Sequence, residues 1–102
     1  MCLIIKMENK TIKYIIDIDG VICDGARPMK SCKPIQKVID KINLLFPDNK
    51  ITLHTSRFEI DRRNTILWLK KNKVKYHKLV MGKPMGDFYI DDKNMSIKEF
   101  LR

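Results

Sequence analysis

Hydrophobic residues along this chain fall into short, separate runs, and the spacing inside each run predicts either a strand or a helix. Four runs are brief and rich in β-branched or aromatic side chains, which is typical of strands buried in a sheet. These runs are Lys13–Ile18, Ile51–His54, Lys78–Met81 and Phe88–Ile90. Met1–Lys6 is either an additional edge strand or a loose end, and Met7–Lys10 is predicted to be a turn.

Two longer segments repeat their apolar positions at the helical period. The first begins at Pro34, a residue that suits the first turn of a helix, and ends before Pro47. The second covers Asp61–Lys71 with Asn72 as its terminator, and Ser96–Arg102 is expected to form a short capped helix. Strands alternating with helices predict an α/β, Rossmann-like three-layer sandwich in which helices cover both faces of a mostly parallel sheet.

Composition narrows this picture without naming a partner. The 102 residues are 44% hydrophobic, so residues 1–102 are expected to form a single domain. Lys and Arg number 21 against 12 Asp and Glu, and the resulting net charge of +9 attracts phosphate esters or nucleic acid. A solvated lysine-rich surface accounts for the same charge equally well.

The cysteines and the lengths of the apolar runs predict a compartment. Cys2, Cys23 and Cys32 have no CxxC spacing and no zinc-type histidine pattern, so we expect free thiols in a reducing environment. No apolar run approaches the roughly 18 to 20 residues that a membrane span needs. A soluble, cytoplasmic protein with no membrane partner is therefore expected.

Polar residues follow each predicted strand at its carboxyl end. In chain order they are Asp17 and Asp19, Thr55 and Ser56, Lys83 in a Gly-Lys-Pro turn, and Asp91 with Asp92. The carboxyl ends of parallel strands meet at one edge of a sheet, where ligands bind, so these side chains are expected to converge. Four carboxylates in one place repel one another unless a cation or a proton offsets the charge, which predicts a divalent metal site.

These motifs resemble, in order, the four motifs of the haloacid dehalogenase (HAD) superfamily of phosphohydrolases, over about residues 12–93. Four shorter stretches are also similar to small capless phosphatases of capsule or lipopolysaccharide biosynthesis, namely 65–70, 74–76, 79–84 and 87–93. The resemblance implies a Mg²⁺-dependent phosphomonoester hydrolase that acts through an aspartyl phosphate. It further implies a sugar phosphate or related small metabolite of polysaccharide biosynthesis as the substrate.

The resemblance also implies roles for the acidic residues. Asp17 is the expected nucleophile, and Asp19 is expected to protonate the leaving alcohol and then to activate water. Neighbouring carboxylates are expected to help keep Asp19 protonated. The expected Mg²⁺ ligands are the carboxylates of Asp17 and Asp91 and a backbone carbonyl near Asp19, with Asp92 either a direct ligand or one shell further out.

Residues with other functional groups complete the expected site. Lys83 is expected to balance the developing phosphoryl charge, and Thr55 or Ser56 to supply the hydroxyl that binds phosphate. Arg57 is either a surface residue at a helix start or a contact to a substrate anion. His54, inside a predicted strand, is expected to be a packed residue, as are Trp68 and Tyr76.

Two other functions fit the same residues. The charge of +9 makes a nucleic-acid 3'- or 5'-end phosphatase an alternative, with steep salt dependence as its signature. A non-catalytic anion-binding or interaction module is the second alternative. No cap domain fits in 102 residues, so the site is expected to be open to bulky substrates or closed by another copy of the chain in a homo-oligomer.

Overall fold

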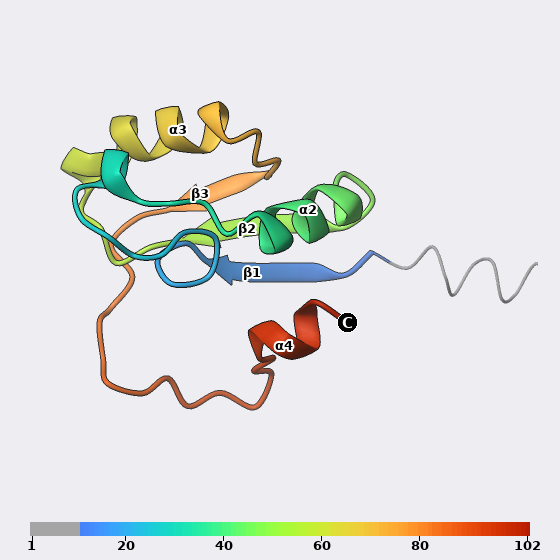
Figure 1. The fold of residues 1–102 in the computed structure, drawn as a ribbon. Coiled ribbons are helices and arrows are strands. Elements are labelled where there is room, and N and C mark those ends of the chain that lie inside the picture. The colour runs from blue at the N-terminus through green and yellow to red at the C-terminus, as the bar shows by residue number, and fades with distance from the viewer. Residues whose placement is uncertain (1–10) are drawn as a thin grey trace, which may run out of the picture.

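Three parallel strands, in the order β1-β2-β3, form the sheet on which the rest of the molecule is built (Figure 1). The structure is a computed structural model and describes residues 11–102, so the predictions for Met1–Lys6 and Met7–Lys10 lie outside it. The strands are β1 (Lys13–Asp17), β2 (Lys50–His54) and β3 (Lys78–Val80), which confirms three of the four predicted runs. Their register aligns the three carboxyl ends at one edge of the sheet.

Each connection between neighbouring strands carries a helix. The elements are η1 (Met29–Ser31) and α2 (Gln36–Leu45) between β1 and β2, then η2 (Glu59–Asp61) and α3 (Arg62–Lys71) between β2 and β3. The predicted capped helix near the C-terminus is α4 (Ile97–Phe100), where Ser96 and Glu99 form a reciprocal capping box. None of the helices among residues 11–102 has the length and apolar character needed to cross a bilayer.

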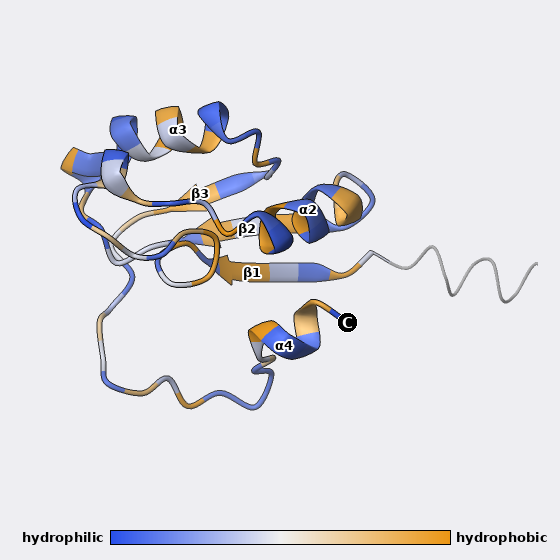
Figure 2. Ribbon diagram, viewed as in Figure 1, coloured by the Kyte–Doolittle hydropathy of each residue, from blue (hydrophilic) through white to orange (hydrophobic). Residues whose placement is uncertain are grey.

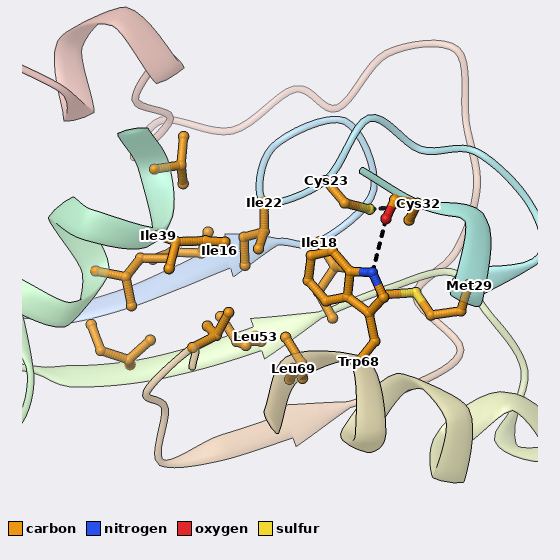
Figure 3. Packing of buried hydrophobic residues seen from close by; sticks show 14 residues of the cluster. Ile16, Ile18, Ile22, Cys23, Met29, Cys32, Ile39, Leu53, Trp68 and Leu69 are labelled. Atoms are coloured by element: carbon orange, nitrogen blue, oxygen red, sulfur yellow. Dashed lines mark hydrogen bonds between the residues drawn. The ribbon is translucent and has the colours of Figure 1, made fainter. Parts of the chain in front are cut away.

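The hydrophobic core lies on one face of the sheet. Ile16 and Leu53 lie in one cluster with Ile39 of α2 and Leu69 of α3 (Figure 3), and Ile51 of β2 is buried in the same cluster. Ile15, on the opposite face of β1, is 69% exposed. Two right-handed crossovers that step in the same direction place their helices on the same face. The Rossmann-like α/β class with a parallel sheet and interleaved helices is therefore confirmed, while among residues 11–102 the face of the sheet that carries Ile15 has no covering helix.

The inward sides of the helices carry the apolar residues that the periodic pattern predicts. In Figure 2 hydrophobic and hydrophilic residues alternate around both α2 and α3. Val38, Ile39 and Ile42 of α2 are buried, and α3 buries Trp68 and Leu69. Tyr76 is half-buried against this core, so the predicted packing of Trp68 and Tyr76 is confirmed.

The predicted strand Phe88–Ile90 does not form. Residues 81–95 contain no helix or strand, and the side chains of Phe88 and Ile90 are 86% and 99% exposed. The run is short and follows Pro84 and Gly86, and it does not pair with the edge of β1, which has no neighbouring strand among residues 11–102. Instead, α4 packs beside β1, where the rings of Tyr14 and Phe100 lie 5.7 Å apart.

The core predicts a contrast between two leucines. Leu53→Ala removes a fully buried side chain of β2 and should lower the free energy of unfolding by about 2–5 kcal/mol. Leu44→Ala, at a position on α2 that is 77% exposed, should change it by less than about 0.5 kcal/mol. Urea unfolding followed by circular dichroism measures both, and equal losses would contradict this assignment of the core.

Candidate active site

The carboxyl end of β1 turns sharply and places two carboxylates at the edge of the sheet. The ladder continues one residue beyond β1, because the Ile18 amide donates to the His54 carbonyl at 3.0 Å. Ile18 is fully buried, so Asp17 and Asp19 on either side of it point away from the core. Gly20 has a φ of +85°, a conformation that a glycine adopts without steric cost and that lets the chain leave the sheet here.

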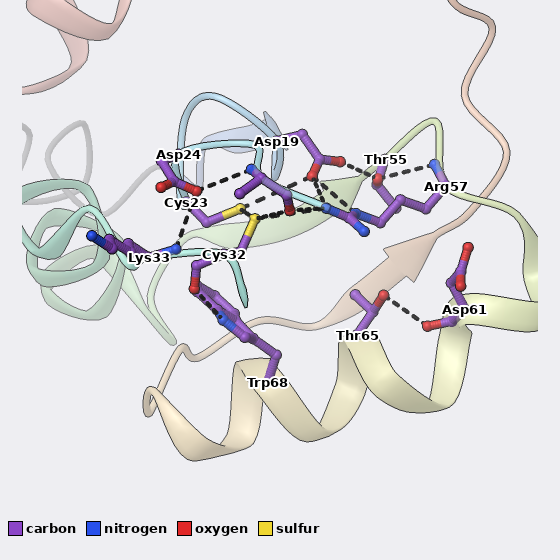
Figure 4. A network of polar contacts seen from close by, with 11 residues as sticks. Asp19, Cys23, Asp24, Cys32, Lys33, Thr55, Arg57, Asp61, Thr65 and Trp68 are labelled. Atoms are coloured by element: carbon purple, nitrogen blue, oxygen red, sulfur yellow. Dashed lines mark hydrogen bonds and ion pairs between the residues drawn. The ribbon is translucent and has the colours of Figure 1, made fainter. Parts of the chain in front are cut away.

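Asp19 is the centre of a polar network that joins the ends of β1 and β2 (Figure 4). Its Oδ2 accepts a hydrogen bond from the Thr55 hydroxyl at 2.6 Å, and its Oδ1 lies 2.8 Å from Arg57 Nη2 and 2.9 Å from Nε. Arg57 is only 2% exposed and also donates to the Ala26 carbonyl at 3.0 Å. Arg57 is therefore a buried partner of Asp19, so the surface alternative for this residue is wrong, and its contact with a substrate anion stays a prediction.

This network determines the charge of Asp19. Burial alone would raise the pKa of its carboxyl group, but the hydrogen bonds from Arg57 and Thr55 and the positive guanidinium outweigh burial and lower the pKa below the ordinary 3.8. Asp19 is consequently ionised at neutral pH. The expectation that neighbouring carboxylates help to keep it protonated is wrong, because its nearest charged neighbour is a cation.

Asp17 is paired with Lys83, as the convergence of strand ends predicts. Lys83 Nζ lies 3.3 Å from Asp17 Oδ2, and the Asp17 side chain remains 32% exposed. The turn after β3 holds the lysine in place, because the Lys83 amide donates to the Thr55 carbonyl at 2.8 Å and Gly82 has a φ of +77°. The ammonium also lies 3.8 Å from the centre of the Tyr89 ring.

Three polar residues follow one another at the end of β2, and they differ in burial and in their contacts. His54 is half-buried opposite Asp17, and burial together with the nearby charge of Lys83 lowers its pKa, although Asp17 acts in the opposite direction. The hydroxyl of Thr55 lies inside the network, where it also accepts the Arg57 amide at 3.1 Å. Ser56 is half-buried on the loop that follows. Thr55 is thus the residue whose hydroxyl contacts Asp19.

The predicted magnesium site is not formed. Asp91 and Asp92 lie on the exposed segment after β3, and within residues 11–102 their carboxylates do not join those of Asp17 and Asp19 in one cluster. Asp91 instead accepts the Lys93 amide at 2.9 Å. Mg²⁺ takes several oxygen ligands. Of the four predicted carboxylates, Asp91 and Asp92 lie away from the site and Asp19 is held by Arg57 and Thr55, which leaves Asp17. The residues as arranged do not fit the ion.

Two cysteines lie beside Asp19, and sequence reasoning did not place them in the site. The Sγ atoms of Cys23 and Cys32 are 2.6 Å apart, and Cys23 Sγ is 4.0 Å from Asp19 Oδ1. Burial, the hydrogen bond to Cys32 and the negative charge of Asp19 raise the pKa of Cys23 to about 12. Nine positions separate the two cysteines along the chain, and no familiar motif has that spacing. Both are free thiols, as expected.

Asp17, Asp19, Thr55 and Lys83 lie together at the edge of the sheet, and we refer to this site as the shelf. Two hollows lie elsewhere on the surface. One hollow lies between α2 and the C-terminus and is lined by Lys37, Lys41 and Leu101 among others. The other lies along the start of α3, beside Ile60 and Leu67. Neither contains a residue of the Asp17 or Asp19 pairs, so they do not contribute to this chemistry.

The Asp19–Arg57 pair predicts a pH-dependent contribution to stability. Because the folded-state pKa of Asp19 is lowered, the ionised pair stabilises the fold above pH 3.8 and stops doing so as the pH falls through the folded pKa. Asp19→Asn should lower the free energy of unfolding at neutral pH, and the gap to wild type should narrow below pH 3.8. Urea unfolding from about pH 7 down to about pH 2 measures the gap.

An exposed carboxylate provides the control for this measurement. Asp48→Asn, just after α2, should leave the free energy of unfolding nearly unchanged across the same range. A gap between wild type and Asp19→Asn that stays constant down to about pH 2 would rule out the proposed charge state of Asp19.

Comparison with known proteins identifies the fold. No protein-family model and no curated protein matches the chain. Among solved structures, a structural-genomics target from Vibrio cholerae is similar with a TM-score of 0.75 and 24% sequence identity, over 89% of this chain and 88% of that chain. The similarity supports the α/β fold with its parallel sheet over nearly the whole length of both proteins, and at this identity it shows the fold alone.

Proposed function

We propose that this protein hydrolyses phosphate monoesters through an aspartyl phosphate on Asp17, with a sugar phosphate or a related small metabolite as substrate. The observation that carries the proposal is the pairing of Asp17 with Lys83, 3.3 Å apart, beside Asp19 and Thr55 at the carboxyl ends of three parallel strands. A nucleophilic carboxylate, a fixed cation and a second carboxylate are the groups that this chemistry requires.

The pair of Asp17 and Lys83 is suited to covalent phosphoryl transfer. Asp17 keeps about a third of its side-chain surface exposed, so a phosphoryl group can reach its free oxygen. The ammonium of Lys83 lies beside that carboxylate and would offset the negative charge that accumulates on the transferred oxygens. Its position is supported from two sides, by the turn after β3 and by the Tyr89 ring.

Asp19 is better suited to activating water than to protonating the leaving alcohol, the two roles expected of it. As an ionised carboxylate held by Arg57 and Thr55, it can accept a proton from the water that attacks the aspartyl phosphate. Donating a proton to a leaving alcohol requires the neutral acid, which its lowered pKa disfavours. Substrates whose leaving group needs no proton should therefore react best in the first step.

Magnesium belongs to the proposal, although the arrangement described above does not fit it. The ion, when bound, would offset repulsion between a nucleophilic carboxylate and phosphate oxygens. Binding through Asp91 or Asp92 would require the segment after β3 to approach β1, whose outer edge is unpaired among residues 11–102. The shelf is open in the described chain, and a second copy that covers it, in a homo-oligomer, is part of the same proposal.

One observation favours a second function. The net charge of +9 would attract a polyanion, so the same site acting on a nucleic-acid 3'- or 5'-phosphate is the alternative. A non-catalytic module that binds anions through Lys83 is the remaining reading. A panel of sugar phosphates, nucleotides and phosphorylated oligonucleotides at two salt concentrations distinguishes the three functions. Only the oligonucleotide reaction should fall steeply with salt, and a non-catalytic module should release phosphate from none of these substrates.

The two aspartates should fail in different ways. Asp17→Asn removes the nucleophile and should abolish phosphate release from p-nitrophenyl phosphate. Asp19→Asn should slow turnover by about 100 to 10,000-fold while still allowing phosphorylation of Asp17, so phosphoprotein should accumulate. Phosphate release and intact mass after rapid acid quenching measure the two effects.

The matched control is Asp40→Asn, an exposed carboxylate of α2 away from the sheet edge, which should keep wild-type turnover. Circular dichroism of each variant shows that it is folded. Turnover by folded Asp17→Asn at the wild-type rate would remove the proposed mechanism, and an Asp19→Asn variant that never carries phosphate would remove the proposed role of Asp19.

Metal dependence tests the predicted involvement of the late acidic pair. Chelation should abolish turnover and added Mg²⁺ should restore it, while Asp91→Asn should raise the Mg²⁺ concentration needed for half-maximal rate by roughly 10-fold or more. Asp87→Asn, an exposed carboxylate on the same segment, is the control. Equal Mg²⁺ requirements for wild type and Asp91→Asn would exclude Asp91 from the metal site.

A further inference from the structure

Cys23 and Cys32 lie closer to one another than two unbonded sulfur atoms ordinarily do. Their Sγ atoms are 2.6 Å apart, and a disulfide bond is about 2.05 Å long. Both side chains are buried, with 0% and 5% of their surface exposed. The two sulfurs therefore need to approach only slightly to become bonded.

Backbone bridges and hydrogen bonds hold the loop that carries the two cysteines. Cys23 forms single-residue bridges with Asp19 on one side and Pro34 on the other. The carboxylate of Asp24 accepts the amides of Ala26 at 3.0 Å and of Lys33 at 3.1 Å, which fastens the start of the loop to its end. These contacts hold Cys23 and Cys32 next to each other in the reduced protein.

A metal ion explains the pair less well. Asp19, Cys23 and Cys32 do bring three ligand atoms within 4.8 Å of one another. A tetrahedral zinc ion with bonds of about 2.3 Å would keep its two sulfurs roughly 3.8 Å apart, well beyond 2.6 Å. The carboxylate of Asp19 is also occupied by the buried cation of Arg57. These contacts favour a sulfur–sulfur bond over shared coordination.

We propose that Cys23 and Cys32 form a reversible intramolecular disulfide, so that residues 20–33 beside the active site constitute a redox-modified loop. With a peroxide as oxidant, the sulfur of one thiol attacks a peroxide oxygen and becomes a sulfenic acid, while the O–O bond breaks and the other oxygen leaves as water or an alcohol with the thiol proton. The second thiol then displaces the hydroxyl group as water. In total, two thiols lose two hydrogen atoms and two electrons, and the peroxide is reduced to water or to an alcohol and water.

The bond would change the surroundings of Arg57. In the reduced protein the Cys32 thiol donates to the Ala26 carbonyl at 3.0 Å, and Arg57 Nη2 donates to the same oxygen at 3.0 Å. Oxidation removes the thiol proton, so Arg57 becomes the remaining side-chain donor to this carbonyl. The loop and Arg57 would then be coupled more tightly, whether or not the site hydrolyses phosphate esters.

Trp68 provides a reporter for this reaction. It is the one tryptophan of the chain, it is buried, and its Nε1 donates to the Cys32 carbonyl at 2.9 Å (Figure 3). A change of bonding at Cys32 should alter its emission. Such a readout does not depend on enzyme activity, so a negative result here is separate from a failure of the proposed hydrolase.

The experiment uses the full chain with Cys2→Ser, which leaves Cys23 and Cys32 as its two thiols. Equimolar hydrogen peroxide should reduce the titratable thiols from two to none, remove two hydrogen atoms from the intact mass, and change Trp68 emission. Closing a loop of this length should raise the melting temperature by on the order of 10 °C. Dithiothreitol should reverse all four changes.

Two single-thiol variants serve as controls. Cys23→Ser and Cys32→Ser, each combined with Cys2→Ser, should show neither the loss of hydrogen atoms nor the rise in melting temperature. A mass gain of oxygen atoms, bonding between chains, or two thiols that remain titratable in the Cys2→Ser protein would overturn the proposal. Protection of both thiols from alkylation by added Zn²⁺ would overturn it in favour of a metal site.

Discussion

The buried ion pair between Arg57 and Asp19 is the contact on which the rest of the site depends. Arg57 is almost wholly removed from water, so its charge must be compensated inside the protein, and Asp19 supplies that compensation at 2.8 Å. The pair joins the ends of β1 and β2, and through the Ala26 carbonyl it also reaches the loop after β1. Three separate segments are thus held in one arrangement by a single guanidinium.

The same pair makes the two carboxylates of the β1 end chemically different. Asp17 and Asp19 are two residues apart on one strand end, yet Asp17 faces a partly exposed lysine while Asp19 lies in a closed network. The first environment leaves an oxygen accessible to a ligand, and the second holds the carboxylate ionised and oriented. Identical side chains therefore suit different tasks because their surroundings differ.

The late acidic pair illustrates a limit of reading strands from short apolar runs. Phe88–Ile90 has the composition of a strand. A strand forms, however, only where hydrogen bonds to a neighbouring strand and burial of one face offset the conformational entropy lost by the backbone. In the described chain these side chains face solvent, while α4 packs beside β1 through the ring contact between Phe100 and Tyr14. The magnesium site predicted from four converging strand ends consequently lacks the carboxylates of Asp91 and Asp92.

The sequence by itself determined most of the helices and strands and part of the site at the sheet edge. Local spacing and turn residues predicted β1, α2, β2, α3 and β3, and the rule that ligands lie beyond the carboxyl ends of parallel strands predicted that Asp17 and Lys83 meet. Only the tertiary structure decided the burial of Arg57, the charge of Asp19 and the contact of Cys23 with Cys32. Those properties arise from distances between segments far apart in the chain and from the exclusion of water, neither of which a local pattern encodes.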